Sequence, residues 1–324
     1  MKRLCNIAMA ATLLAGSQAV LADAKWDFPT GYGVNSFQTE NLQQFANEVG
    51  KATGGKLVMT VHPNGSLYKA NEIKRAVQTG QVQIGEFILS GAANENPLYG
   101  IDSVPFLATS YADARRLSVV SRPAIEKLLA SQGMKLLYVS PWPGQSLYSV
   151  KPVNAAADLR GTKMRAYNPA TNRIAQLVKA QPATIQLAEL GQALATGAVD
   201  NFLTSSASGI ENKLYEQVKH FYPVNAWLPK NAVVVSQKAF GALDMAAQQA
   251  VLAAAQAAEE RGWKLSEQKD QEYVKQLAAN NMVVAKPSAA LQSELMAVGE
   301  TMTEEWLRTA GDEGKRIIDA YRKQ

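Results

Sequence analysis

The chain has 324 residues, of which 47% are hydrophobic and 19% are charged, and its formal net charge is +5. This length predicts two domains and allows a core large enough to be stable without disulfides. The charges are mixed along the chain and no basic tract is interleaved with aromatic residues, which argues against a nucleic-acid-binding protein. A small positive excess is compatible with anionic solutes.

The first 24 residues have the pattern of a secretory signal peptide. Lys2 and Arg3 precede an apolar run from Ile7 to Leu21, and Ala22-Asp23-Ala24 follows as a small-x-small cleavage site. We predict cleavage after Ala24, with cleavage after Ala22 as the alternative. The sequence therefore predicts export, to the periplasm of a bacterium.

Cys5 is the single cysteine of the chain, and it lies before the apolar run rather than after it. It is therefore not placed as a lipoprotein anchor, and the mature protein has no disulfide. No later segment holds about 18 uninterrupted apolar residues, so we expect a soluble mature protein.

Strand and helix patterns alternate along the mature chain, which favours an α/β architecture with largely parallel sheets. In the first half, strands are predicted over 27–34, 56–62, 82–89 and 134–139, and helices over 39–52, 71–79 and 111–132. Pro123 is expected to break the last of these helices in two. In the second half, strands are predicted over 162–167, 183–187 and 199–203, and helices over 169–179 and 188–196.

Residues 244–279 consist almost entirely of good helix formers. Asp244 can cap the start of this helix and Asn280-Asn281 can close it, whereas Gly262 could bend or divide it. At 1.5 Å per residue the helix would be about 54 Å long, which exceeds the diameter of a domain of about 150 residues. Its apolar positions keep no heptad, so a coiled coil fits less well than a helix that braces two domains.

The segment from Gly161 to Pro169 reads as a short strand that runs directly into a helix. Lys163, Arg165 and Tyr167 alternate with apolar residues, and Asn168-Pro169 is typical of a helix start. Arg165 is thus expected near the carboxyl end of a strand and beside a helix N-terminus, where open α/β sheets bind ligands. A guanidinium there suits a carboxylate. The alternative is a surface arginine that pairs with an acid such as Asp158.

Signals for catalysis are few. The mature chain has two histidines, His62 and His220, far apart in sequence, and no cluster with metal-ligand spacing. The partial glycine pattern Gly31-Tyr32-Gly33 lacks the third glycine of a dinucleotide loop, and Ser205-Ser206 has no nucleophile-elbow signature. These patterns predict no enzyme, no metal and no cofactor.

Aromatic residues gather at the ends of the predicted elements, at positions 87, 142, 148, 167 and 227. Pro141-Trp142-Pro143-Gly144 and Trp227-Leu228-Pro229 place these two tryptophans in rigid segments without regular structure. Each could be a packing residue or the wall of a ligand cleft, and an aromatic ring beside an arginine would form a pocket for a small acid.

Four segments together resemble the periplasmic solute receptors of tripartite ATP-independent (TRAP) transporters, the DctP-like family. They are Glu72 to Gly85, Asp102 to Leu107, Asp158 to Arg165, and Ala193 to Asp200, and the resemblance covers essentially the whole mature chain. It implies an α/β fold of two lobes joined by hinge segments, with a long helix bracing both. It also implies that a cleft closes on a solute, which is then delivered to a sodium-driven membrane permease.

The resemblance divides the chain into a signal peptide and two domains. Domain I would comprise 25–142 plus 230–269, and domain II, which includes the carboxylate-binding arginine, would comprise 143–229 plus 270–324. A monomer is the default expectation. Some relatives hold a metal ion that bridges the carboxylate, and the sequence neither supports nor excludes one here.

The family's carboxylate-clamping arginine falls on Arg165. A second family position that often holds an arginine is Gln145 here, and a frequent asparagine is replaced by Thr204. Because a charged second anchor is missing, dicarboxylates and sialic acid are disfavoured. A small monocarboxylate with a hydroxyl or oxo group fits better, as does an aromatic acid stacked on Trp227.

The expected site places Arg165 in a bidentate pair with the carboxylate. Gln145, Asn168 and Thr204 would add neutral hydrogen bonds, Tyr167 and Trp227 would wall the pocket, and the opposite lobe would contribute Asn35, Phe87 and Ser90. Two other functions are alternatives to a transport receptor. A ligand sensor for a membrane kinase would use the same site, whereas a periplasmic enzyme would need an acid-base pair that the sequence does not offer.

Overall fold

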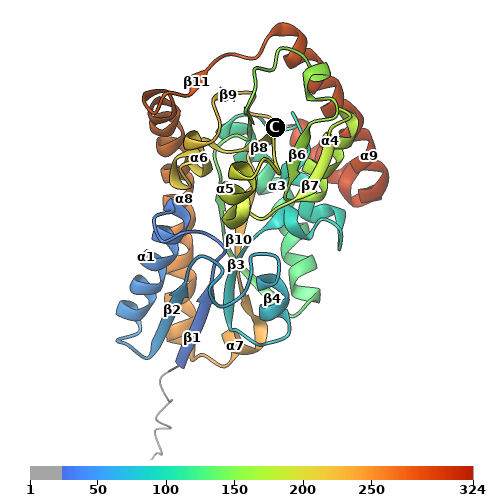
Figure 1. Cartoon of the computed structure of the whole chain (residues 1–324). Helices are drawn as coiled ribbons and strands as arrows, with labels where there is room; N and C mark the ends of the chain where they lie inside the picture. Colours follow the sequence, from blue (N-terminus) through green and yellow to red (C-terminus); the bar gives the residue numbers. More distant parts are fainter. Residues whose placement is uncertain (1–23, 324) are drawn as a thin grey trace, which may run out of the picture.

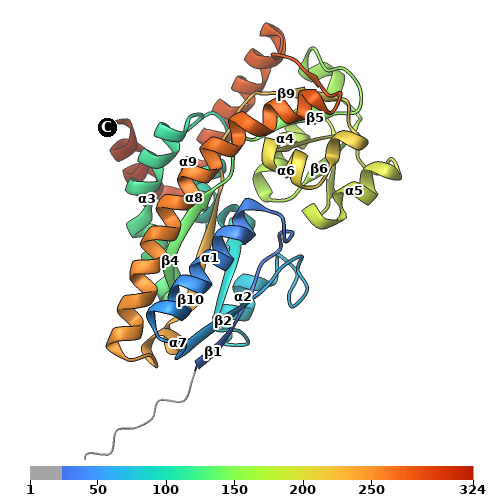
Figure 2. The same ribbon diagram turned by 90° about the vertical axis from the view of Figure 1, so that its left-hand side faces the viewer.

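The computed structural model describes residues 24–323, so the predicted signal peptide lies outside the described residues except for Ala24. The chain forms two α/β lobes, and long helices run along both (Figures 1 and 2). This confirms the two-lobed architecture. Within residues 24–323 no helix combines the length and the apolar character needed to cross a membrane.

The first lobe is built on two small sheets. One pairs β1 (Ala24–Pro29) with β2 (Leu57–His62) in parallel, and the other has the antiparallel order β3 (Ile84–Ile88), β10 (Lys230–Ser236), β4 (Met134–Pro141). The helices of this lobe are α1 (Phe37–Ala52), α2 (Ile73–Gln78), α3 (Tyr111–Ser131) and α7 (Gln237–Gly241).

The second lobe is built on one six-stranded sheet. Its order is β11 (Val283–Val284), β9 (His220–Tyr222), β5 (Ser146–Ser149), β8 (Asn201–Thr204), β6 (Lys163–Ala166), β7 (Gln181–Thr184). Its short helices are α4 (Pro169–Leu177), α5 (Leu187–Ala195) and α6 (Ser206–Glu211).

The expectation of largely parallel sheets is wrong, because both lobes contain antiparallel pairs. β10 runs antiparallel to both of its neighbours, and β5 runs antiparallel to β8 and β9. The cause is the path of the chain: β5 and β10 each follow a segment that crosses between the lobes. Such strands enter a sheet from the other lobe instead of following a helix that covers the same sheet.

The two crossover segments, residues 142–145 and 223–229, lie side by side and are joined by backbone hydrogen bonds. Trp142 N–H donates to the carbonyl of Pro229, and Gln145 N–H donates to that of Trp227, each at 2.8 Å. The Ala226 N–H returns a bond to the Gln145 carbonyl at 2.8 Å. The connection between the lobes is therefore a hydrogen-bonded pair of segments rather than a loose linker.

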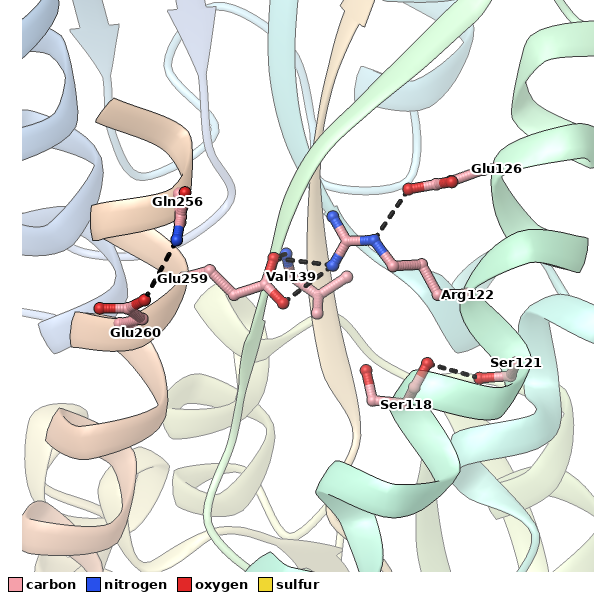
Figure 3. Close-up of polar contacts among 8 residues, drawn as sticks. All are labelled: Ser118, Ser121, Arg122, Glu126, Val139, Gln256, Glu259 and Glu260. Atoms are coloured by element: carbon pink, nitrogen blue, oxygen red, sulfur yellow. Dashed lines mark hydrogen bonds and ion pairs between the residues drawn. The ribbon is translucent and has the colours of Figure 1, made fainter. Parts of the chain in front are cut away.

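Helix α8 (Met245–Ala279) confirms the predicted brace, and the Asp244 carboxylate caps it by accepting the Ala247 N–H at 2.7 Å. In the first lobe, Glu259 of α8 accepts two bonds from Arg122 of α3, at 2.8 and 2.9 Å (Figure 3). In the second lobe, the Ser206 hydroxyl at the start of α6 donates to Asp270 of α8 at 2.6 Å. The helix is thus fixed to both lobes.

The C-terminal helix α9 (Ala289–Arg322), which the pattern reading did not identify, also contacts both lobes. Leu291 and Leu295 pack in the core of the second lobe, whereas Ile318 and Tyr321 pack in that of the first. Between them Gly311 has a φ of 59°, which kinks the helix. The residues after this kink therefore pack on the first lobe.

Pro123 does not break α3, contrary to expectation. The helix is continuous from Tyr111 to Ser131, and Pro123 and Val119 both lie on its exposed face. The ring of Pro123 removes one hydrogen bond to the Val119 carbonyl. Because that carbonyl faces solvent, water can replace the lost bond while the buried stripe continues through Ile125 and Leu129.

Gly262 does not divide α8 but lets it approach the first lobe closely. A Cβ atom built on Gly262 would lie 2.5 Å from the Ser140 hydroxyl oxygen and 3.1 Å from the Asn41 side-chain nitrogen. These are neighbours on β4 and α1, so a side chain here would push the brace away from both elements.

We predict that Gly262→Ala lowers the free energy of unfolding by about 1–3 kcal/mol, as overpacking of a core does. The matched control is Gly191→Ala in α5, where a Cβ meets no atom within 4 Å. That variant should be neutral or more stable by up to about 1 kcal/mol, since alanine favours a helix over glycine. Urea unfolding of both variants measures the difference, and equal stability of the two would contradict the close-packing account.

Candidate functional site

A cavity of about 270 Å³ lies between the lobes, where the crossover segments meet them. Residues from the first lobe, from both crossover segments and from the second lobe line it. The first lobe contributes Gly31, Tyr32, Asn64, Gly65, Lys69, Ala70 and Ile88, and the crossover segments contribute Trp142, Gln145 and Pro229. The second lobe contributes Arg165, Tyr167, the run 186–189, Thr204 and Ser208.

Arg165 is the central cation of this cavity. It belongs to β6, and the predicted strand-to-helix signal after it is confirmed, since Asn168 caps α4 by accepting the Thr171 N–H at 2.8 Å. The Arg165 side chain is 3% exposed, its Nε donates to the Ile185 carbonyl at 2.9 Å, and its guanidinium lies 5.0 Å from the Tyr167 ring centre. Burial lowers the pKa of Arg165 to about 10, so it remains a cation at neutral pH.

No Asp or Glu among residues 24–323 forms an ion pair with Arg165. The alternative partner, Asp158, instead accepts the backbone N–H groups of Asn154 and Ala155 at 2.7 and 3.1 Å. Those bonds hold the pKa of the Asp158 carboxyl below its ordinary value. The geometry thus leaves the terminal nitrogens of the Arg165 fork free to take an external carboxylate.

Three neutral residues of the expected site surround Arg165 in the cavity wall: Gln145, Tyr167 and Thr204. The Tyr167 hydroxyl donates to the Gln145 amide oxygen at 3.0 Å, and the Gln145 amide nitrogen donates to the Pro143 carbonyl at 3.2 Å. This chain of bonds fixes the Gln145 amide on the crossover segment beside the tyrosine ring. The site therefore combines one buried cation with oriented neutral polar groups.

The structure places other expected residues beside the cavity rather than in its wall. Asn168 donates its amide N–H to the Ser90 hydroxyl at 2.9 Å, a buried bond between the lobes. Phe87 packs in the core of the first lobe and lines a smaller neighbouring chamber, and Asn35 lines a separate hollow. Asn168 and Ser90 therefore hold the lobes together next to the cavity.

Trp227 does not line the cavity, although it was expected to wall the pocket. Its ring is fully buried in the core of the second lobe. The tryptophan that does line the cavity is Trp142, on the paired crossover segment. The ring of Trp142 lies 4.8 Å from that of Tyr32, between centres, and both residues line the cavity, so these two rings form an aromatic wall of it.

Sequence reasoning did not assign Tyr32, Asn64, Lys69, Gln186 or Glu189 to the site, yet all of them line the cavity. Tyr32 and Asn64 lie in adjacent turns of the first lobe, and the Asn64 N–H donates to the Tyr32 carbonyl at 2.7 Å. The two glycines that flank Tyr32, Gly31 and Gly33, are the local sequence signal of the first of these turns. Nothing in the local sequence of Lys69 or Glu189 indicates that they face a common cavity.

A second contact between the lobes involves Glu211 at the end of α6. Its carboxylate accepts the Phe37 N–H at the start of α1 at 3.1 Å. Burial raises the pKa of Glu211 to about 7 despite that bond. Phe37 also packs with Trp142 and Tyr273 in an apolar cluster between the lobes. This side of the interface is thus held by one hydrogen bond and a small core.

Within the described chain, no group of three or more His, Cys, Asp or Glu residues is arranged to hold a metal ion. The cavity itself carries one arginine, one lysine and one glutamate among its lining residues.

Comparison with known proteins places the chain in a family. Residues 30–309 match the model of the bacterial extracellular solute-binding protein family 7, DctP, so the chain belongs to this family. The crystal structure of DctP6, a Bordetella pertussis extracytoplasmic solute receptor binding pyroglutamic acid, is 51% identical and superposes with a TM-score of 0.91. That match covers 93% of this chain and 100% of DctP6.

Two further relatives agree with this assignment. DctP7 of Bordetella pertussis, also a receptor binding pyroglutamic acid, is 42% identical with a TM-score of 0.91, over 92% of this chain and 99% of DctP7. A solute-binding protein of Albidiferax ferrireducens is 28% identical over 210 residues, which span 64% of this chain and 62% of that protein. The chain is therefore an extracytoplasmic solute receptor of a TRAP transporter, and the resemblance stated from its motifs is confirmed.

We predict that Glu211 makes stability depend on pH. Because the folded state holds this proton up to about pH 7 while the unfolded chain releases it near its ordinary value, stability falls as pH rises through this range. Glu211→Gln keeps the acceptor for Phe37 N–H but cannot ionise. Its free energy of unfolding relative to the native protein should therefore increase from pH 5 to pH 7.5. Urea unfolding at both pH values tests this, and a difference independent of pH would contradict it.

Proposed function

We propose that this receptor binds a small cyclic monocarboxylate of the pyroglutamate type and delivers it to the membrane permease of its transporter. The observation that carries the proposal is the buried Arg165 fork, which no acid of the described chain neutralises. One desolvated guanidinium calls for one carboxylate, because a paired charge removes the cost of burying the cation. The 51% and 42% identical receptors that bind pyroglutamic acid support the same solute class.

The rest of the cavity wall suits the remainder of such a solute. A five-membered lactam has a flat, partly apolar ring with one N–H donor and one carbonyl acceptor. The rings of Tyr32 and Trp142 offer a surface for the ring, and the amide of Gln145 and the hydroxyl of Thr204 offer neutral hydrogen bonds. A volume of about 270 Å³ suits a small solute. Lys69 in the first lobe supplies a second positive charge in the wall, but Glu189 lines the cavity as well.

Binding and closure are coupled because the solute contacts both lobes at once. Arg165 and Thr204 belong to the second lobe, whereas Tyr32 and Asn64 belong to the first. A solute that reaches both sets of groups only in the closed arrangement shifts the population toward that arrangement. The closed receptor is then the form offered to the permease.

Export precedes this function. We propose that the N-terminal signal directs the chain to the periplasm and is then removed. The Ala24 N–H donates to the Lys56 carbonyl at 2.8 Å at the start of β1, so cleavage after Ala22 would keep this bond in the mature protein. We expect the mature receptor to act as a monomer.

We predict that Arg165→Ala weakens binding of L-pyroglutamate by about 2–5 kcal/mol, because it removes the charged partner of a buried carboxylate. Arg165→Lys should also bind more weakly, since an ammonium cannot reproduce the fork. Isothermal titration of protein that has been unfolded, stripped of ligand and refolded measures both. Arg160→Ala, an exposed arginine before the same strand, is the matched control and should bind like the native protein. If Arg165→Ala bound within about threefold of the native protein, the clamp would be wrong.

We predict that the solute class can be read from thermal shifts with four probes. L-Pyroglutamate should raise the melting temperature by several degrees by mass action. 2-Pyrrolidinone lacks the carboxylate, L-proline carries an ammonium in place of the lactam, and succinate carries a second carboxylate, so each should have a much smaller effect. An equal shift with 2-pyrrolidinone would refute the carboxylate anchor, and an equal shift with succinate would refute the restriction to monocarboxylates.

A further inference from the structure

A buried acid, Glu86, lies behind the aromatic wall of the cavity. It belongs to β3, its side chain is 1% exposed, and no Lys, Arg or His of the described chain forms an ion pair with it. One carboxylate oxygen accepts the Asn231 amide N–H at 2.9 Å, and the other accepts the Thr30 hydroxyl at 2.5 Å. An unpaired acid at such a position costs free energy that an apolar residue would not.

Asn231, on the neighbouring strand β10, connects this acid to the cavity. Its side chain is fully buried, and its single amide oxygen accepts two donors: the Trp142 indole N–H at 2.9 Å and the Tyr32 hydroxyl at 3.0 Å. Both donors belong to the rings that line the cavity. One oxygen atom thus holds the two members of the aromatic wall together.

The acid holds the nitrogen end of this amide. A buried amide can present either its oxygen or its nitrogen to a given neighbour, and the hydrogen bonds decide between them. Glu86 has acceptors for the amide N–H, so the nitrogen turns toward β3 and the oxygen turns toward Trp142 and Tyr32. The Trp142 indole N–H can only donate and therefore also requires the amide oxygen, so without an acceptor at position 86 the amide would be held at its oxygen end alone and its nitrogen would be left buried without a partner.

We propose that Glu86 is a positioning residue of the solute site, which orients the Asn231 amide so that it holds Tyr32 and Trp142 in place as the ligand-binding wall. The expected effect on solute binding rests on the proposed function, whereas the hydrogen bonds that connect Glu86, Asn231 and the two rings do not depend on it. The same arrangement survives protonation, because a carboxylic acid can still accept the Asn231 N–H while it donates to the Thr30 hydroxyl. Glu86 therefore acts through its shape and its acceptor, not through its charge.

Two substitutions separate the acceptor from the charge. Glu86→Gln keeps an oxygen for Asn231 and an N–H that can reach the Thr30 hydroxyl, so L-pyroglutamate should bind within about threefold of the native protein. Glu86→Leu has a similar volume but no acceptor, so affinity should fall at least tenfold. Asn231→Ala should give a similar loss, and the double variant Glu86→Leu with Asn231→Ala should lose no more than Asn231→Ala alone, because the acid acts through the amide.

A ligand-independent readout keeps this inference separate from the proposed function. The fluorescence of each variant minus that of its Trp142→Phe counterpart isolates the emission of Trp142. This difference spectrum should change in Glu86→Leu and Asn231→Ala and be retained in Glu86→Gln. Val251→Ala in α8, a fully buried change in the same lobe, is the control for lowered stability alone and should leave both the spectrum and the affinity unchanged.

The outcomes are distinct. If the native protein does not bind L-pyroglutamate, the proposed function fails, whereas the Trp142 spectra still test the positioning role. If folded Glu86→Leu keeps both the native affinity and the native Trp142 spectrum, the positioning role is overturned. If Glu86→Leu does not fold, the positioning role is tested with Asn231→Ala and Glu86→Gln instead. A native spectrum in Asn231→Ala, or a loss of affinity in Glu86→Gln equal to that expected for leucine, would overturn it as well.

Discussion

The central constraint in this receptor is a buried guanidinium without an internal acid. Arg165 is compensated only in part, by the Ile185 carbonyl and by the face of Tyr167. An aspartate or glutamate in contact with it would stabilise the protein but would occupy the position that a solute carboxylate needs. The remaining wall around Arg165 is mostly neutral, and under the proposed function the uncompensated part of its burial cost would become binding free energy when a carboxylate enters. The cores of the two lobes and the contacts of α8 with both lobes offset the cost of burying this cation.

The connection between the lobes is also part of the site. Trp142 and Gln145 lie on the crossover segment that pairs with residues 223–229, and both face the cavity. Under the proposed closure, rotation of the lobes would move this segment and with it Trp142 and Gln145. Helix α8 is fixed to the first lobe through Glu259 and to the second through Asp270. Closure and recognition of the solute, as proposed, would therefore involve the same contacts.

The sequence predicts well what is encoded locally. The cap and proline at Asn168-Pro169 and the cap at Asp244 marked helix starts that the structure contains, and the strand before Asn168 placed Arg165. The two tryptophans of the crossover segments show where local information ends. Trp142 and Trp227 both lie within two residues of a proline, yet Trp142 faces the cavity and Trp227 the core. That difference is set by how the two segments pair, residue 142 with 229 and residue 145 with 227, which is a contact between distant parts of the chain. The same holds for Lys69 and Glu189, which line one cavity only because the two lobes face each other.

Each lobe buries an ionisable group that has no ion-pair partner among the described residues. The second lobe holds a cation without an acid at Arg165, and the first holds an acid without a base at Glu86, in the residues that the structure describes. Each is hydrogen-bonded to neutral groups. Burial raises the pKa of Glu86 to about 7, so this carboxyl carries only part of a negative charge at neutral pH, whereas Arg165 stays fully charged. Under the proposed function, Arg165 supplies the charge that pairs with the solute carboxylate, and Lys69 and Glu189 add one charge of each sign to the cavity wall. Glu86 would act instead through Asn231, whose hydrogen bonds hold the rings of Tyr32 and Trp142.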